Sequence, residues 1–328
     1  MRRVLPATIV VLALLLLAAG GAALWSLREY RAPGPAEQDV VEVLPRGAGL
    51  SAIAARLHQA GVIRRELMFV AAVRLSGVAP HLKAGEYRFP AHASLAQVIE
   101  QLTQGRTVVH KLTVPEGLTS IEVLQLVDNA EALAGDPPPP PPEGSLLPET
   151  YFYSYGDTRV ALLQRMQAAM QETLKGLWDA RKPGLPLATP EQALTLASIV
   201  EKETALPAER PHIAGLFLNR LKRGMRVQSD PTVAYGLTNG EAPLGHEISR
   251  ADLDSDTPFT PSRLEGLPPH PIATPGRAAI AAVLQPEDTR DLYFVADGTG
   301  GHVFSETLEQ HNRNVRRWRA LHLPAGSK

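Results

Sequence analysis

The sequence predicts an α+β fold with one N-terminal apolar helix, a small α+β module and a larger mixed α/β part. Three observations predict this architecture. An uncharged run of twenty-two residues covers 4–25. Strand and helix patterns alternate within 39–107, in the order strand, helix, helix, strand, helix. Long amphipathic helices and short strands then fill 108–323, and a length of 328 residues exceeds what one compact core usually needs.

The composition excludes several classes of protein and site. The chain has 33 basic and 34 acidic residues and a net charge of −1, so no overall field attracts nucleic acid, and none is expected as a partner. It has no cysteine, which excludes disulfides, thiol nucleophiles and cysteine-ligated zinc. Its histidines lack metal-site spacing, so neither a metal nor a cofactor is expected.

The apolar run at 4–25 is long enough to cross a bilayer once. As a helix it spans roughly 30 Å of hydrocarbon. A cleaved signal peptide is the alternative, because Ala18 and Ala23 are small, but the apolar core of a signal peptide is usually only about 7–15 residues long. Flanking charges weakly favour a cytoplasmic tip at 1–3. Residues 26–38 are then the predicted linker on the opposite side.

The small module is predicted from alternation and helical spacing. DVVEVLP at 39–45 alternates like a strand and leads into a helical stretch. A second helix is expected over 64–77 and a second strand over 84–90. The third helix begins after Ser94, a good capping residue, and ends at Gly105.

The larger part begins with a strand over 108–117 and a helix over 119–130. Six successive prolines at 137–142 predict a stiff surface loop. An amphipathic helix of about seven turns follows over 157–181. The glycine-rich segment at 298–301 is a predicted hairpin turn between LYFVAD and HVFS, and no strand-to-helix context supports a phosphate cradle there.

The next helix, EQALTLASIVEKETA, is the most informative segment. Thr189, Pro190 and Gln192 predict its start, with a capping box. Two carboxylates, Glu201 and Glu203, fall in its apolar sector and point in opposite directions, so this helix cannot supply both carboxylates of one site. Such a group either pairs with an arginine or acts as a general acid, because an apolar pocket raises a carboxyl pKa toward neutrality.

Other polar residues near this helix are candidates for binding hydroxyl or N-acetyl groups. The alternatives for them are ordinary roles in an Asp-Pro turn, at a helix end or between helices. These candidates are Ser198, Asn219, Gln228, Asp230 and Tyr235.

Several motifs, in their order, resemble the YceG-like, or MltG, family of membrane-anchored endolytic murein transglycosylases. They are ASIVEKET, QSDPTVAYG, IATPG and YFVADGTGGHVFS, and they lie within 190–312. EGSLLPETY at 143–151 also fits this family, and the module at 39–107 resembles its LysM-like subdomain. The resemblance implies a YceG-like catalytic domain over 108–323.

The resemblance implies that Glu201 is the catalytic acid. It would protonate the glycosidic oxygen between N-acetylmuramic acid and N-acetylglucosamine, then take the proton of the muramyl C6 hydroxyl and leave a 1,6-anhydro end. It also implies peptidoglycan strands as substrate and peptidoglycan synthases as candidate partners. The anchor at 4–25 would sit in inner-membrane lipid, with the catalytic domain in the bacterial periplasm, where cleavage of nascent strands would end their elongation.

Two alternatives stay open. A muramidase-type hydrolase would need a second carboxylate about 5–9.5 Å away, for which Asp230 and Glu241 are candidates. A non-catalytic peptidoglycan-binding scaffold is the other. One departure favours it, because Thr260, Pro261 and Ser262 stand where the family usually has Asn-Thr-Tyr.

Overall fold

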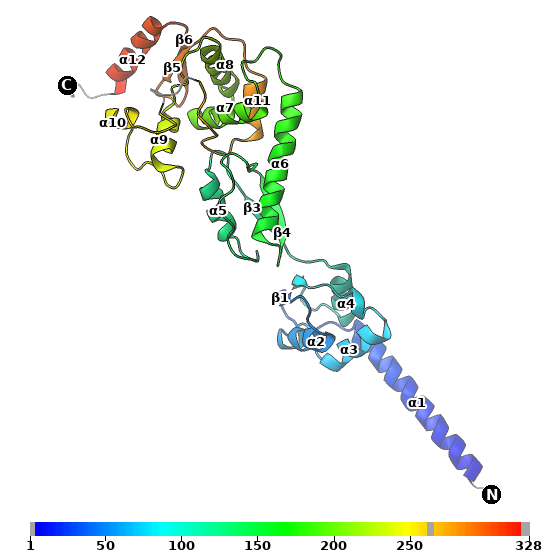
Figure 1. The fold of residues 1–328 in the computed structure, drawn as a ribbon. Helices are drawn as coiled ribbons and strands as arrows, with labels where there is room; N and C mark the ends of the chain where they lie inside the picture. Colours follow the sequence, from blue (N-terminus) through cyan, green and yellow to red (C-terminus); the bar gives the residue numbers. More distant parts are fainter. Residues whose placement is uncertain (1–3, 261–265, 323–328) are drawn as a thin grey trace. The chain divides into compact units, whose positions relative to one another are not determined.

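The computed structural model describes residues 4–260 and 266–322, and their contacts divide the chain into two units (Figure 1). The first unit runs to His110 and includes 154–156, and the second holds the rest of the chain. The α+β class is confirmed. Every sheet in the described residues has two strands, so the larger unit is mainly helical. The predicted tip at 1–3 lies outside the described residues.

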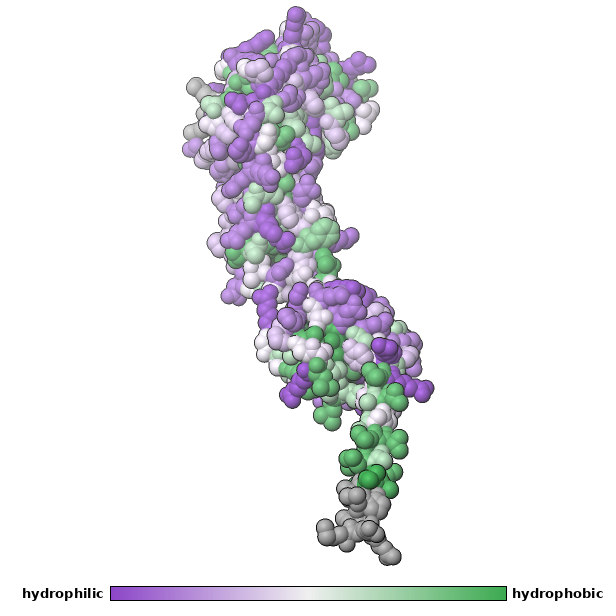
Figure 2. Space-filling view, turned by 90° about the vertical axis from the view of Figure 1, so that its right-hand side faces the viewer, coloured by the Kyte–Doolittle hydropathy of each residue, from purple (hydrophilic) through white to green (hydrophobic). Residues whose placement is uncertain are grey.

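Helix α1, Val4–Arg31, confirms the N-terminal apolar helix and continues six residues past the predicted end at 25. Its segment Ile9–Arg31 has a mean hydropathy of 2.3 and is long and apolar enough to cross a membrane. The most apolar 18-residue window of that segment has no residue buried inside the protein. Figure 2 shows it as a green, hydrophobic rod.

The first unit has the predicted order of strand, helix, helix, strand and helix. Strands β1 and β2 pair antiparallel, with Val40 opposite Phe89. Ser94 and Gln97 form a capping box at α4, and Gly105 ends this helix in the left-handed conformation, as predicted. The elements are β1 Val40–Leu44, α2 Leu50–Gln59, α3 Glu66–Leu75, the short 3-10 helix η1 Ala79–His81, β2 Gly85–Phe89 and α4 Leu95–Gln104.

The segment after α1 is bound to the first unit by hydrogen bonds. The Gly34 N–H donates to the His92 carbonyl at 3.0 Å, and the His92 N–H donates to the Ala36 carbonyl at 2.8 Å. Tyr30, in the last turn of α1, packs against the core of this unit. Most of the segment expected as a linker is therefore folded against the module.

The second unit contains predicted elements and adds others that the sequence did not predict, namely strand β4, helix α9, the short helices α10 and α11, and the C-terminal α12. Strands β5 and β6 pair antiparallel and confirm the hairpin around 298–301. The elements are β3 Val109–Thr113, α5 Ser120–Asp128, β4 Thr150–Ser154, α6 Arg159–Asp179, α7 Pro190–Glu203, α8 Arg210–Lys222, α9 Asp230–Thr238, α10 Arg250–Leu253, α11 Arg277–Leu284, β5 Tyr293–Ala296, β6 His302–Ser305 and α12 Leu308–His322.

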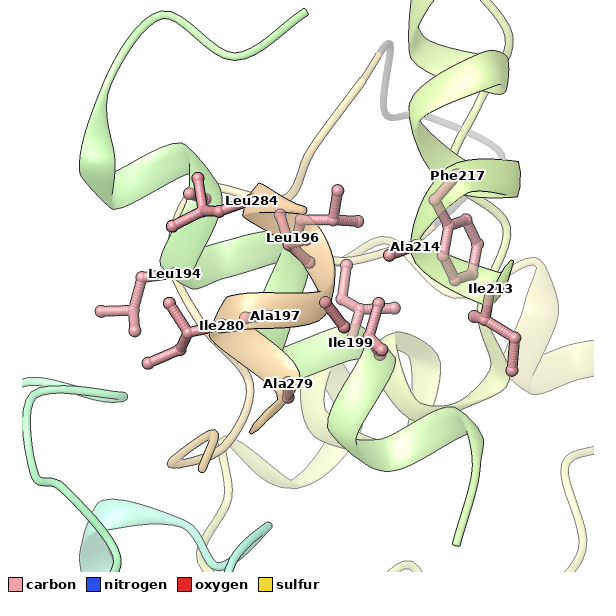
Figure 3. Close-up of a cluster of buried hydrophobic side chains, with 14 of the residues drawn as sticks. Leu194, Leu196, Ala197, Ile199, Ile213, Ala214, Phe217, Ala279, Ile280 and Leu284 are labelled. Atoms are coloured by element: carbon pink, nitrogen blue, oxygen red, sulfur yellow. The ribbon is translucent and has the colours of Figure 1, made fainter. Parts of the chain in front are cut away.

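Helix α7 lies at the centre of this unit and packs against α6, α8 and α11. Figure 3 shows its apolar side chains between those of α8 and α11. Every residue from 193 to 201 is buried, including the polar residues Thr195 and Ser198. A helix enclosed on all sides positions its side chains rigidly, because a close-packed core resists displacement.

Two local predictions differ from the structure. Asp230 and Pro231 begin helix α9 where the sequence predicts a turn, because proline fits the first turn of a helix and an acidic side chain is stabilised there. At α7, Thr189 caps as predicted. The Gln192 side chain, however, accepts from the N–H of Ala188, one residue before the predicted partner, so the capping box is not formed as expected.

Candidate active site

Helix α7 holds the backbone of 272–276 at two points, one helical turn apart. The Ser198 hydroxyl accepts the N–H of Ile272 at 3.0 Å and donates to the Thr195 carbonyl at 2.7 Å. The Glu201 carboxylate accepts the N–H of Gly276 at 2.9 Å. This segment and α7 therefore form one rigid wall around the Glu201 carboxylate.

A second segment, the loop 116–118 after strand β3, packs against this wall. The Gly117 N–H donates to the Thr274 carbonyl at 2.9 Å, and the Thr274 N–H returns a bond to the Leu118 carbonyl at 2.7 Å. The Lys202 ammonium donates to the Gly117 carbonyl at 3.1 Å. These bonds bring Glu116 next to the Glu201 carboxylate, although eighty-five residues separate the two in the chain.

The Glu201 carboxylate is buried, and its side chain is only 3% exposed. Arg210 Nη2, from the first turn of α8, lies 2.6 Å from Glu201 Oε1. Burial raises the pKa of the Glu201 carboxyl, and the adjacent Glu116 carboxylate raises it further, whereas the Gly276 N–H and the Arg210 charge lower it. The net direction is upward, which favours the protonated form that a general acid needs.

Glu116 shares Arg210 with Glu201. Arg210 Nη2 lies 3.2 Å from Glu116 Oε2, and the Glu116 side chain is 41% exposed while that of Arg210 is 10% exposed. Glu116 is thus the solvent-exposed member of a network of two carboxylates and one guanidinium. No sequence pattern predicted Glu116 or Arg210 as part of this site. Their motifs, VPEG and ERPH, contain no spacing that links them to α7.

Another carboxylate, the half-buried Glu143, fixes Tyr235 on helix α9. It accepts from the Ser120 N–H at 2.9 Å, from the Gly144 N–H at 3.2 Å and from the Tyr235 hydroxyl at 3.3 Å. Burial raises the pKa of the Glu143 carboxyl. The Tyr235 ring also packs edge-on against Phe259 at 5.0 Å between centroids.

A cleft of about 680 Å³ lies beside this network. Two predicted binding residues, Asp230 and Tyr235, line it, together with Lys202 and Ile272. Glu201 does not line the cleft, and its carboxylate is buried against Arg210 and Gly276. The other lining residues include Thr119, Glu122, Ala234, Thr238, Gly240 and His246.

A smaller pocket of about 240 Å³ lies on another side of α7. Glu203, Gln228 and Asp230 line it, so Asp230 borders both hollows. Burial raises the pKa of the Glu203 carboxyl to about 7, although the nearby Ser229 side chain lowers it. Glu201 and Glu203 therefore have different neighbours, as their i,i+2 spacing predicts.

The remaining predicted residues have structural contacts. Asn219 donates to the Thr289 carbonyl at 2.7 Å and lines neither hollow described above. Glu241 is exposed and also lies outside the cleft lining. Thr260 is fully buried and bonds to the Thr257 hydroxyl at 2.8 Å, whereas Pro261 and Ser262 lie outside the described residues.

In the described parts of the chain, no group of three or more acidic or histidine side chains could hold a metal ion.

Two curated proteins are similar to most of this chain. A Bacillus subtilis protein named endolytic murein transglycosylase is 32% identical over 311 residues, which cover 84% of this chain and 83% of that protein. A Streptococcus pneumoniae protein of the same name is 30% identical over 320 residues. That match covers 83% of this chain, and the chain spans 57% of the length of the pneumococcal relative.

A solved structure and a family profile match over similar lengths. The crystal structure of a yceG-like protein from Listeria monocytogenes is 28% identical, with a TM-score of 0.52, and the match covers 84% of this chain and 99% of that one. The YceG-like family matches residues 42–317, which include all the segments that form the Glu201 network. The chain therefore belongs to the YceG-like family.

Proposed function

We propose that this protein is an endolytic lytic transglycosylase that cleaves the bond between N-acetylmuramic acid and N-acetylglucosamine in nascent peptidoglycan strands. One observation carries the proposal. Glu201 is a buried carboxyl with a raised pKa, and it stands where the family motif ASIVEKET places its acid. The relatives named endolytic murein transglycosylase support the same reaction class.

Glu201 supplies both proton transfers. In the first, its proton goes to the glycosidic oxygen, the bond from C1 of N-acetylmuramic acid to that oxygen breaks, and the N-acetylglucosamine hydroxyl leaves. In the second, the Glu201 carboxylate takes the proton of the muramyl C6 hydroxyl, whose oxygen bonds to C1. The product is a 1,6-anhydro end, and no water is consumed.

The neighbours of Glu201 suit a group that changes charge during the reaction. The Gly276 N–H and Arg210 stabilise the carboxylate that exists between the two transfers. Burial and Glu116 favour the protonated state before it. A glycan in the cleft would contact Asp230 and Tyr235, whose carboxylate and aromatic ring suit sugar hydroxyls and ring faces.

The remaining parts of the chain suit action on the outer face of the bacterial inner membrane. Helix α1 would be the single-pass anchor, with the two units in the periplasm. The first unit would bind glycan as a LysM-like module, because its element order resembles that subdomain. Peptidoglycan synthases are the proposed partners, since they make the strands that this enzyme would cut.

Product analysis tests the reaction. Purified full-length protein digests murein, and mass spectrometry identifies the new glycan ends. Anhydro ends are expected from the wild type, and Glu201→Gln should lose at least about 100-fold in rate, the usual contribution of a general acid. Glu191→Gln is the matched control, since Glu191 is exposed at the start of the same helix. Reducing ends would indicate a hydrolase, and an inactive wild type would indicate a scaffold.

Orientation is tested separately, because the chain contains no native cysteine. A single cysteine at Gln171, exposed on α6, should react with a membrane-impermeant maleimide in spheroplasts. A cysteine that reacts only after the cells are lysed would place the second unit in the cytoplasm.

A further inference from the structure

We propose that the exposed face of helix α3 lies on the surface of the bilayer that holds α1, with anionic phospholipid headgroups as its partner. The proposal rests on the membrane anchoring proposed above and adds a second contact between this protein and the lipid. It assigns a role to the first unit that is independent of glycan binding.

The face consists of Leu67, Ala71, Arg74 and Leu75, all exposed. Their spacing of i, i+4, i+7 and i+8 places them on one stripe of the helix. Leu67 is 83% exposed and Leu75 is 89% exposed. Single exposed leucines are ordinary, but two on one stripe, separated only by alanine and arginine, form an amphipathic face of the kind that binds membrane interfaces.

Helix α3 lies at the membrane end of the first unit. Helix α1 packs against α3 and α4 (Figure 1). The guanidinium of Arg65, immediately before α3, lies 5.2 Å from the ring centroid of Trp25. Trp25 ends the apolar run, and tryptophan at such an end typically lies at headgroup level. The first turn of α3 is therefore held at that level, and Figure 2 shows green surface on this unit next to α1.

The charges around this face complement an anionic surface. Arg28 and Arg31 lie in the last turn of α1, and Arg74 lies on the stripe itself. Arg64 and Arg65 precede α3, where the helix dipole disfavours cations, so helix stability does not explain them. No acidic residue lies on the stripe. Anionic headgroups attract such juxtamembrane cations, and this attraction adds to burial of the two leucines.

A single fluorescent label tests the contact in the full-length chain. Because there is no native cysteine, Leu75→Cys provides one site for a nitrobenzoxadiazole label at an exposed position. The labelled protein is reconstituted into vesicles of phosphatidylglycerol with phosphatidylcholine, or of phosphatidylcholine alone. Lipids spin-labelled near the headgroup serve as quenchers. Arg88→Cys, exposed on strand β2 and outside the stripe, is the matched control.

The proposal expects blue-shifted emission at Leu75→Cys in the anionic vesicles and several-fold stronger quenching than at Arg88→Cys. Adding Arg74→Glu should weaken this quenching. Flotation of the vesicles reports α1 anchoring independently. Protein that floats while the label at position 75 is as water-exposed as the control would overturn the docking and leave the anchor intact. Protein that does not float would overturn both, while product analysis still tests the reaction.

Discussion

The Glu116 carboxylate packs directly against Gly276, so a side chain at this position would displace Glu116. A Cβ at this position would lie 1.8 Å from Glu116 Oε1. Its backbone φ is −74°, a value that any residue adopts, so the contact with Glu116 and not the backbone conformation distinguishes glycine from alanine here. The same residue donates its N–H to Glu201. One glycine therefore contacts both carboxylates of the site.

Gly276→Ala should reduce activity without unfolding the protein. The added methyl must displace either Glu116 or the backbone that bonds to Glu201, and loss of one such bond is worth roughly a tenfold or greater fall in kcat. Rates of murein cleavage and circular dichroism together measure this. Gly176→Ala is the matched control, since a Cβ at that exposed position on α6 meets nothing within 4 Å. Equal rates for the two variants would contradict the proposed role of Gly276.

Glu116→Gln should shift the pH profile of cleavage toward acid. The general acid must be protonated, so kcat/KM falls as pH rises through the Glu201 pKa. The Glu116 carboxylate raises the pKa of Glu201, so removing its charge lowers that pKa. Without Glu116 as a second ion partner, Arg210 would pair with Glu201 alone, which lowers the Glu201 pKa further. The falling limb should therefore move to lower pH. A limb that stays in place would show that Glu116 does not tune Glu201.

Arg210→Gln should produce the opposite shift. Removing the cation raises the Glu201 pKa, so the falling limb moves to higher pH. The variant should also be less stable by about 3 kcal/mol at alkaline pH, where a buried carboxylate is left without its partner. Urea unfolding in detergent micelles measures this loss, which should shrink at acidic pH as Glu201 takes up a proton.

Glu203→Gln should change how stability depends on pH. The folded-state pKa is raised from 4.5 to about 7, so the folded protein holds this proton more tightly than the unfolded chain does. Wild-type stability therefore falls as pH rises from about 4.5 to 7. The glutamine variant lacks this fall and should gain about 1–3 kcal/mol relative to wild type over that window. Unfolding midpoints at pH 4.5 and pH 8 would show it, and a constant difference between the two proteins would argue against the raised pKa.

Asn219→Ala and Asp230→Asn should affect different quantities. Asn219 bonds to backbone carbonyls of 289–291, so its loss should cost about 1–2 kcal/mol of stability and leave KM unchanged. Asp230 is exposed in the cleft, so its change should raise KM with little effect on stability. Steady-state kinetics and thermal unfolding separate the two. A raised KM for Asn219→Ala would instead show that Asn219 contributes to substrate binding.

The sequence predicted most elements because their signals are local. The apolar run of α1, the N-terminal cap at Ser94 and the glycine that ends α4 each involve residues within one or two turns. The prediction of a turn at Asp230 and Pro231 was wrong. A turn and the first turn of a helix use the same residue types, so local sequence did not distinguish them. The pattern alone cannot separate these two outcomes.

The sequence by itself determined that one carboxylate, Glu201, lies on a buried helix and faces away from Glu203. Only the tertiary structure decided which groups surround it. Glu116 and Gly276 lie eighty-five residues before and seventy-five residues after Glu201, and Arg210 comes from the next helix. Backbone bonds between the loop 116–118 and Thr274 bring them together. Helical periodicity relates residues only a few turns apart, whereas a pKa depends on every charge within several ångströms, whatever its distance along the chain.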